Sequence, residues 1–152
     1  MSRERQELLS RGALGVFRLN GQFLAVAEEL AGPAGLTAAR WQVLGAVLAE
    51  PLSVAGIARV MGITRQSVQR IADLLVERGL AEYRPNPAHR RAKLLAPTEE
   101  GHAAVGRIGP GHAAFADRLA EAFGEAELAE AVGILERLAD VLEKLDPPVT
   151  EP

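Results

Sequence analysis

Apolar residues recur at steps of three and four along most of the chain, the spacing typical of α-helices that bury one face. The first such segment spans residues 2–31 and ends where Gly32 and Pro33 interrupt the pattern. Serine or threonine precedes several later segments and indicates helix N-termini. We therefore expect further helices over 37–49, 53–61, 64–78, 98–123 and 125–145, with Gly109-Pro110-Gly111 kinking or splitting the helix over 98–123.

Two short segments in the middle of the chain follow a different pattern. Residues 80–84 and 91–96 are predicted to be strands, because the residues between them, 85–90, have the composition of a turn. The sequence thus predicts a single domain, 1–152, that is mainly α-helical, with six helices and a small β-hairpin. Residues 146–152 include three prolines and are predicted to form a loose tail.

Three central residues have the spacing of a helix-turn-helix. Ala58 lies where two helices would approach most closely, Gly62 supplies the positive φ of a tight turn, and Val68 fills the space between the helices. This spacing is common by chance, but here helix-capping residues and a hairpin accompany it. We therefore predict a helix-turn-helix whose second helix begins at Thr64.

The second helix of this pair has a polar face suited to DNA. At about 100° per residue, Val68, Ile71 and Leu75 fall on one side and a group of polar residues falls on the other. Glutamine and arginine can each form two hydrogen bonds with a base edge, so the first two turns are expected to enter the major groove. The residues predicted to bind DNA are Thr64, Arg65, Gln66, Ser67, Gln69 and Arg70. The alternative is an ordinary amphipathic helix with a solvated polar face.

The predicted hairpin concentrates cations around its turn. Arg84, Arg90, Arg91 and Lys93 are expected to contact the adjacent minor groove, where narrow stretches focus negative potential. A solvent-exposed loop that protects the strand edges from aggregation is the alternative.

The formal net charge of -3 conceals an uneven distribution. Residues 52–95 hold eight basic and three acidic side chains, whereas the rest of the chain holds nine and seventeen. A basic centre between acidic ends favours one surface that faces an anionic polymer. Random scatter of charge is the alternative explanation of these counts.

What the sequence lacks disfavours several classes of function. It has no cysteine, and therefore no disulfide, thiolate metal site or cysteine nucleophile. No apolar run approaches the roughly 18–20 residues that span a bilayer, and no signal peptide is recognisable, so we expect a cytoplasmic protein without membrane contact. The three histidines have no catalytic or metal-binding spacing, and phosphate-loop and hydrolase motifs are missing. We therefore expect no enzyme, no cofactor and no metal site.

Over almost its whole length the sequence resembles the MarR (multiple antibiotic resistance regulator) family of winged helix-turn-helix proteins. Three segments carry the resemblance: residues 36–44, residues 53–80 with their final Glu-Arg-Gly-Leu, and residues 90–101 with Arg-Arg-Ala-Lys-Leu-Leu. Two positions depart from the family pattern. His89 stands where the family often has an aspartate that would brace Arg91, and Pro97 stands where it usually has leucine.

The resemblance implies a homodimeric transcriptional regulator that binds a pseudo-palindromic site on double-stranded DNA. It places the DNA-binding part at 36–97 and the dimerisation helices at 1–31 and 98–146. It also implies a repressor that a small amphipathic or phenolic ligand releases, with Phe17, Trp41, His112 and Phe115 as the expected pocket residues. Plain core packing is the alternative for these four. The alternative function is a winged helix that makes protein–protein contacts without binding DNA.

Overall fold

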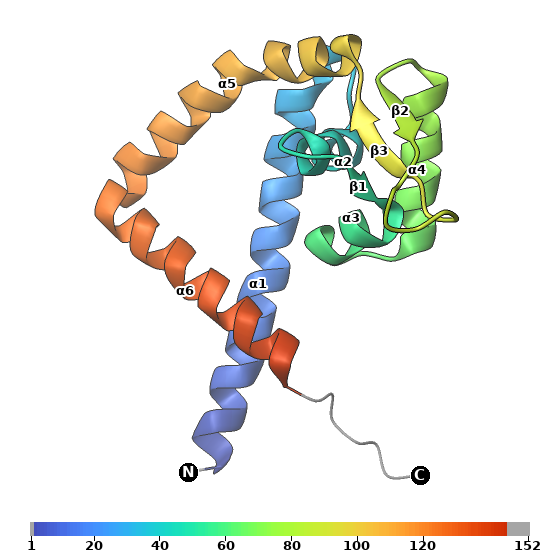
Figure 1. The fold of residues 1–152 in the computed structure, drawn as a ribbon. Coiled ribbons are helices and arrows are strands. Elements are labelled where there is room, and N and C mark those ends of the chain that lie inside the picture. Colours follow the sequence, from blue (N-terminus) through green and yellow to red (C-terminus); the bar gives the residue numbers. More distant parts are fainter. Residues whose placement is uncertain (1, 146–152) are drawn as a thin grey trace. The chain divides into compact units, whose positions relative to one another are not determined.

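The computed structural model describes residues 2–145, which form two compact units divided between Pro110 and Gly111. The first unit contains α1 (Ser2–Ala31), a 3-10 turn (Gly32–Ala34), α2 (Ala38–Val47), β1 (Leu52–Ser53), α3 (Val54–Met61), α4 (Arg65–Glu77), β2 (Ala81–Arg84), β3 (Leu94–Pro97) and the first half of α5 (Glu99–Phe123). The second unit contains the rest of α5 and α6 (Glu125–Lys144). The predicted mainly α-helical chain with six helices and a small β wing is confirmed (Figure 1).

Side-chain caps fix where the central helices begin. The hydroxyls of Thr37, Ser53 and Thr64 each accept a backbone N–H from the residue three positions later, at 3.1–3.2 Å. These bonds satisfy donors that have no partner inside the helix. Between α3 and α4, Gly62 has a φ of 68°, the left-handed conformation that the turn requires. The predicted helix-turn-helix is therefore present.

The wing is a three-stranded antiparallel sheet in the order β1-β3-β2. The strand predicted over 91–96 begins only at Leu94, because Leu94 pairs with Arg84, the last residue of β2. Residues 85–93 therefore form one long loop, which we call the wing loop. The third strand, β1, was not predicted, since two residues carry no periodic signal. In Figure 1 the wing loop projects at the same end of the first unit as the turn that joins α3 to α4.

A core of aliphatic side chains holds α4 in place. Leu44 from α2, Ile57 from α3, Leu75 from α4 and Leu95 from β3 are fully buried in one cluster. Val68 is also fully buried, as the predicted inner face of α4 requires. Burial of such a side chain stabilises the fold by about 1.5–3 kcal/mol. The outer face of α4 is therefore held on a rigid support.

The terminal helices have few buried residues in the described structure. In α1 only Ala31 is buried, and α6 has none. The segment Gly109-Pro110-Gly111 does not split α5, which continues through Pro110. The loose tail predicted for 146–152 lies outside the described residues.

One glycine of α5 is required by a close backbone approach. A Cβ at Gly101 would lie well inside contact distance of the Leu80 carbonyl oxygen, which precedes β2. Gly101→Ala is therefore expected to lower the free energy of unfolding by about 1–3 kcal/mol, as overpacking does. Gly106→Ala is the matched control, because a Cβ there meets nothing within 4 Å. The control should raise stability by about 0.4–1 kcal/mol. Urea unfolding of both variants measures the two changes in stability. Equal urea midpoints for Gly101→Ala and Gly106→Ala would contradict the close approach at Gly101.

Candidate nucleic-acid interface

The outer face of α4 carries four of the ten residues predicted to bind DNA. Arg65, Gln66, Gln69 and Arg70 are exposed on its first two turns. The two predicted hydroxyls are engaged locally: the Thr64 hydroxyl donates to the Ser67 hydroxyl at 2.9 Å and accepts the Ser67 N–H. Thr64 is therefore the N-cap of α4, and its hydroxyl is already engaged with Ser67.

A hollow of about 580 Å³ separates this face from the wing. Its lining includes Arg65, Gln66 and Gln69 from α4, Arg91 and Lys93 from the wing loop, and Ser53 at the start of α3. Three cations thus face one concavity together with the N-terminus of a helix, which attracts anions. Residues that are 28 positions apart in sequence, Arg65 and Lys93, meet here because the wing loop folds back toward α4.

Most of the predicted DNA-binding cations are free to meet a phosphate. Among residues 2–145, no ion pair involves Arg65, Arg70, Arg90, Arg91 or Lys93. Arg84 differs, because its Nη2 lies 2.8 Å from Glu82 Oε1 and its Nε donates to the same oxygen at 2.9 Å. A DNA phosphate would have to compete with Glu82 for Arg84.

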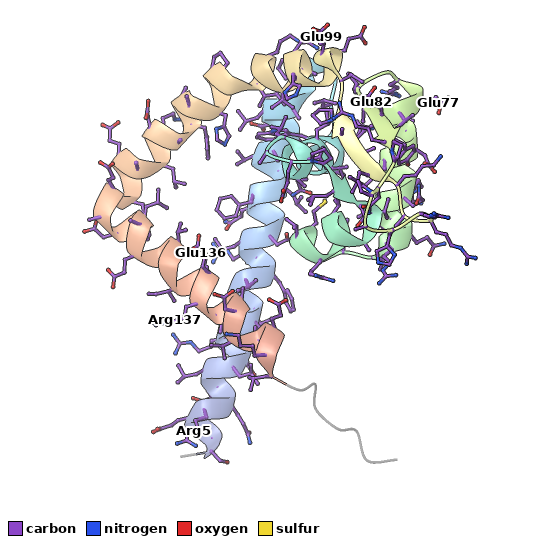
Figure 2. The ribbon with its side chains drawn as sticks, viewed as in Figure 1. Arg5, Glu77, Glu82, Glu99, Glu136 and Arg137 are labelled. Carbon is purple, nitrogen blue, oxygen red and sulfur yellow. The ribbon has the colours of Figure 1, made fainter. Side chains whose placement is uncertain are left out.

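The acidic residue at the C-terminal end of α4 lies away from the hollow. Glu77 occupies the last residue of α4, and Figure 2 places it at the opposite end of this helix from the wing loop. Phosphate groups would be repelled there and attracted at the N-terminal end. The charge distribution therefore orients α4 with its first turns toward an anionic partner, as the sequence predicts.

Three polar side chains at the hollow form a cluster that was not predicted. Gln69 Nε2 donates to Asp73 Oδ1 at 2.9 Å and to the Tyr83 hydroxyl oxygen at 3.0 Å, while the Tyr83 hydroxyl donates to Asp73 Oδ1. Partial burial is the main cause that raises the pKa of Tyr83 to about 12. The hydrogen bond to Asp73 and the negative charge of Asp73 contribute in the same direction. The hydroxyl therefore keeps its proton at neutral pH. The four-residue spacing of Gln69 and Asp73 on a helix indicates that these two side chains can form a hydrogen bond. Tyr83 gave no such signal, because it lies on β2 and reaches the cluster only through the folding of the sheet.

The residues predicted to line a ligand pocket are divided between the two units. Exposed Phe17 and half-buried Trp41 belong to the first unit, and exposed His112 and half-buried Phe115 belong to the second. The Phe115 ring lies 5.9 Å from the guanidinium carbon of Arg118. The pocket itself stays a prediction.

Residues 2–145 contain no group of three or more histidine and acidic side chains placed to hold a metal ion. Within that range no helix has both the length and the apolar character needed to cross a membrane.

Comparison with known proteins identifies relatives in sequence and in structure. A sequence profile of the MarR family matches residues 34–92, which include α2, α3, α4 and most of the wing loop. An uncharacterised protein of Mycobacterium tuberculosis is 42% identical over 120 residues, or 79% of this chain and 84% of that protein.

Two solved structures of one regulator are similar over most of the chain. The transcriptional repressor CouR bound to a 23-mer DNA duplex has a TM-score of 0.72 and 28% identity, covering 82% of this chain and 89% of that chain. CouR from Rhodococcus jostii RHA1 bound to p-coumaroyl-CoA has a TM-score of 0.68 and 27% identity, covering 90% and 92%.

Proposed function

This chain belongs to the MarR family of transcriptional regulators, and from that premise we propose that it is a ligand-responsive repressor that binds a pseudo-palindromic operator as a homodimer. The segments that the sequence predicts to bind DNA and to form the dimer keep these functions in the proposal. Residues 36–97 bind DNA, and residues 1–31 and 98–146 form the dimer. As a regulator of this kind, the protein works in the cytoplasm and catalyses no reaction.

The hollow between α3, α4 and the wing loop most strongly favours DNA as the partner. Its cations have no carboxylate partner among the described residues, and glutamines that suit base edges stand beside them. A winged helix that only binds proteins would present an apolar or acidic outer face on α4. Here that face is polar and basic at its N-terminal half, which favours DNA over the alternative.

Two structures of one relative, CouR, support the finer parts of the proposal. CouR is described as a repressor bound to DNA, and CouR is also described with p-coumaroyl-CoA, an aromatic thioester. We extend both properties to this chain: it represses, and a small amphipathic or phenolic ligand releases it from DNA. Phe17, Trp41, His112 and Phe115 are the aromatic side chains we assign to the ligand.

Selection from a random duplex library tests the proposal. The purified full chain is incubated with duplexes that carry a randomised core, and bound sequences are amplified and read. The expected result is a two-fold symmetric sequence whose half-sites lie about one helical turn, roughly 34–36 Å, apart. If bound and unbound pools keep the same composition, sequence-specific binding is ruled out.

The wing loop gives a prediction that salt titration can check. Arg91 lies in the hollow and has no carboxylate partner among residues 2–145. Arg91→Ala should weaken binding and reduce the slope of log K against log salt concentration by about 0.9 for each phosphate contact that is lost. Arg107→Ala, which removes an exposed cation of α5, is the matched control and should keep the slope. An unchanged slope for Arg91→Ala would mean that the wing loop does not touch DNA.

A further inference from the structure

Both amide hydrogens of Gln69 are already used inside the protein. Its Nε2 donates to Asp73 Oδ1 at 2.9 Å and to the Tyr83 hydroxyl oxygen at 3.0 Å. A glutamine amide nitrogen carries only two hydrogens. Across residues 2–145, no donor is bonded to Gln69 Oε1. The side chain is exposed beside the hollow and therefore presents an acceptor without a donor.

Because both amide hydrogens are already donated, Gln69 can recognise fewer base edges. A free glutamine reads adenine with two bonds, accepting from N6 and donating to N7. With both donors occupied, only the bond accepted by Oε1 remains. In the major groove, adenine N6 and cytosine N4 are the amine donors, whereas guanine and thymine present acceptors. An acceptor alone therefore favours adenine or cytosine equally and disfavours guanine and thymine.

We propose, on the basis of the proposed DNA binding, that Asp73 and Tyr83 are positioning residues that clamp Gln69 into an acceptor-only reader of adenine or cytosine. The operator then contains, in each half-site, one position that tolerates either of these bases on the contacted strand. Gln69 is the specificity-determining residue at that position.

The clamp is anchored on both sides. Asp73 lies one turn after Gln69 on α4, and Tyr83 lies on β2. Tyr83 is half-buried, and its partner in the sheet register is Leu95, a fully buried core residue. The Tyr83 hydroxyl donates to Asp73 Oδ1, so its oxygen is free to accept from Gln69. Three bonds among three side chains leave Gln69 little rotational freedom.

The charge of Asp73 also explains why its hydrogen bonds with Gln69 and Tyr83 are formed before DNA binds. A carboxylate accepts stronger hydrogen bonds than a neutral oxygen does. Asp73 draws in the Gln69 amide and the Tyr83 hydroxyl at the same oxygen. The wrong amide orientation, with Oε1 toward Asp73, would bring two acceptors together. The carboxylate therefore fixes which end of the amide faces DNA.

Base-preference profiles of variants test the clamp. The probe is the random duplex library, selected separately with the wild type, Gln69→Ala, Tyr83→Phe and Asp73→Ala. Gln69→Ala should lose its preference at one position of each half-site, which identifies the contacted position. At that position the wild type should accept adenine and cytosine within about twofold. Tyr83→Phe and Asp73→Ala each free an amide hydrogen for N7, so both should favour adenine over cytosine by about threefold to tenfold.

Two controls separate positioning from charge and from folding. Asp73→Asn removes the same charge as Asp73→Ala but keeps an oxygen that can accept from Gln69 and Tyr83, so its preference for adenine should be weaker than that of Asp73→Ala. Glu77→Ala removes an exposed carboxylate that lies outside the cluster and should leave base preference unchanged. Tyr83→Phe keeps the aromatic ring, and thermal melting of each variant verifies that it folds.

The outcomes distinguish this inference from the proposed function. If the wild type enriches no sequence, DNA recognition itself fails and the clamp fails with it. If the wild type enriches an operator but Tyr83→Phe and Asp73→Ala give its profile unchanged, only the clamp is overturned. A strict adenine preference in the wild type, or no effect of Gln69→Ala at any position, would likewise overturn it.

Discussion

A chain in which Leu135 and Leu142 are both replaced by glutamate is expected to sediment as a monomer at micromolar concentration and to bind its operator at least about a hundredfold more weakly. The two leucines are 41% and 58% exposed on α6. They belong to a stripe at three- and four-residue steps that also includes Leu128, Val132 and Leu138. In the homodimer that we propose, such a stripe packs against another apolar surface. Glutamates there would have to lose their hydration inside an interface.

The loss in DNA affinity follows from the symmetry of the complex. A dimer binds its second half-site at the high effective concentration set by the first, and a monomer lacks this advantage. Arg137→Glu is the matched control: it changes the net charge by the same amount, but at about 100° per residue it lies on the other side of α6 from Leu135. Sedimentation velocity and operator titration of both variants check the prediction. A dimer that survives the two glutamates would exclude this face as the interface.

Replacing Gln66 and Arg70 together with alanine is expected to weaken binding to the selected operator by about 2–6 kcal/mol. Both side chains are exposed on the first two turns of α4, and neither forms a hydrogen bond or ion pair with another side chain among residues 2–145. Binding to a shuffled duplex should fall far less, because its phosphates still meet the remaining cations. Equilibrium titration on both duplexes measures the difference.

An exposed glutamine on a neighbouring helix controls for nonspecific effects of the substitution. Gln42→Ala on α2 should leave both affinities unchanged. A double variant of Gln66 and Arg70 that retains its preference for the operator would show that the outer face of α4 does not read bases.

Local chemistry made most of the fold predictable from sequence. The caps at Ser53 and Thr64, the turn at Gly62 and the buried stripe through Val68 all act over a few residues, and each lies where it was predicted. The start of β3 was predicted three residues too early because it is set by pairing with β2, a contact between distant positions. β1 was missed because a strand of two residues carries no periodic signal, and it is defined only by its pairing with β3.

The candidate site shows the same division between local and distant effects. The exposed polar face of α4 follows from helical periodicity, so its residues were identified from sequence. Tyr83 was not, because its bonds to Gln69 and Asp73 depend on how β2 packs against α4. The ion pair between Glu82 and Arg84 was also missed, although two residues separated by one position on a strand share a face and gave a usable signal.

The most direct test is an equilibrium titration of the wild-type chain with its selected operator and with a shuffled duplex of the same length and composition. Both titrations are carried out at one physiological salt concentration, since affinity for DNA depends steeply on salt. The operator is expected to be bound at least about a thousandfold more tightly than the shuffled duplex. Equal affinity for the two duplexes, or no binding to either, would contradict the proposed function.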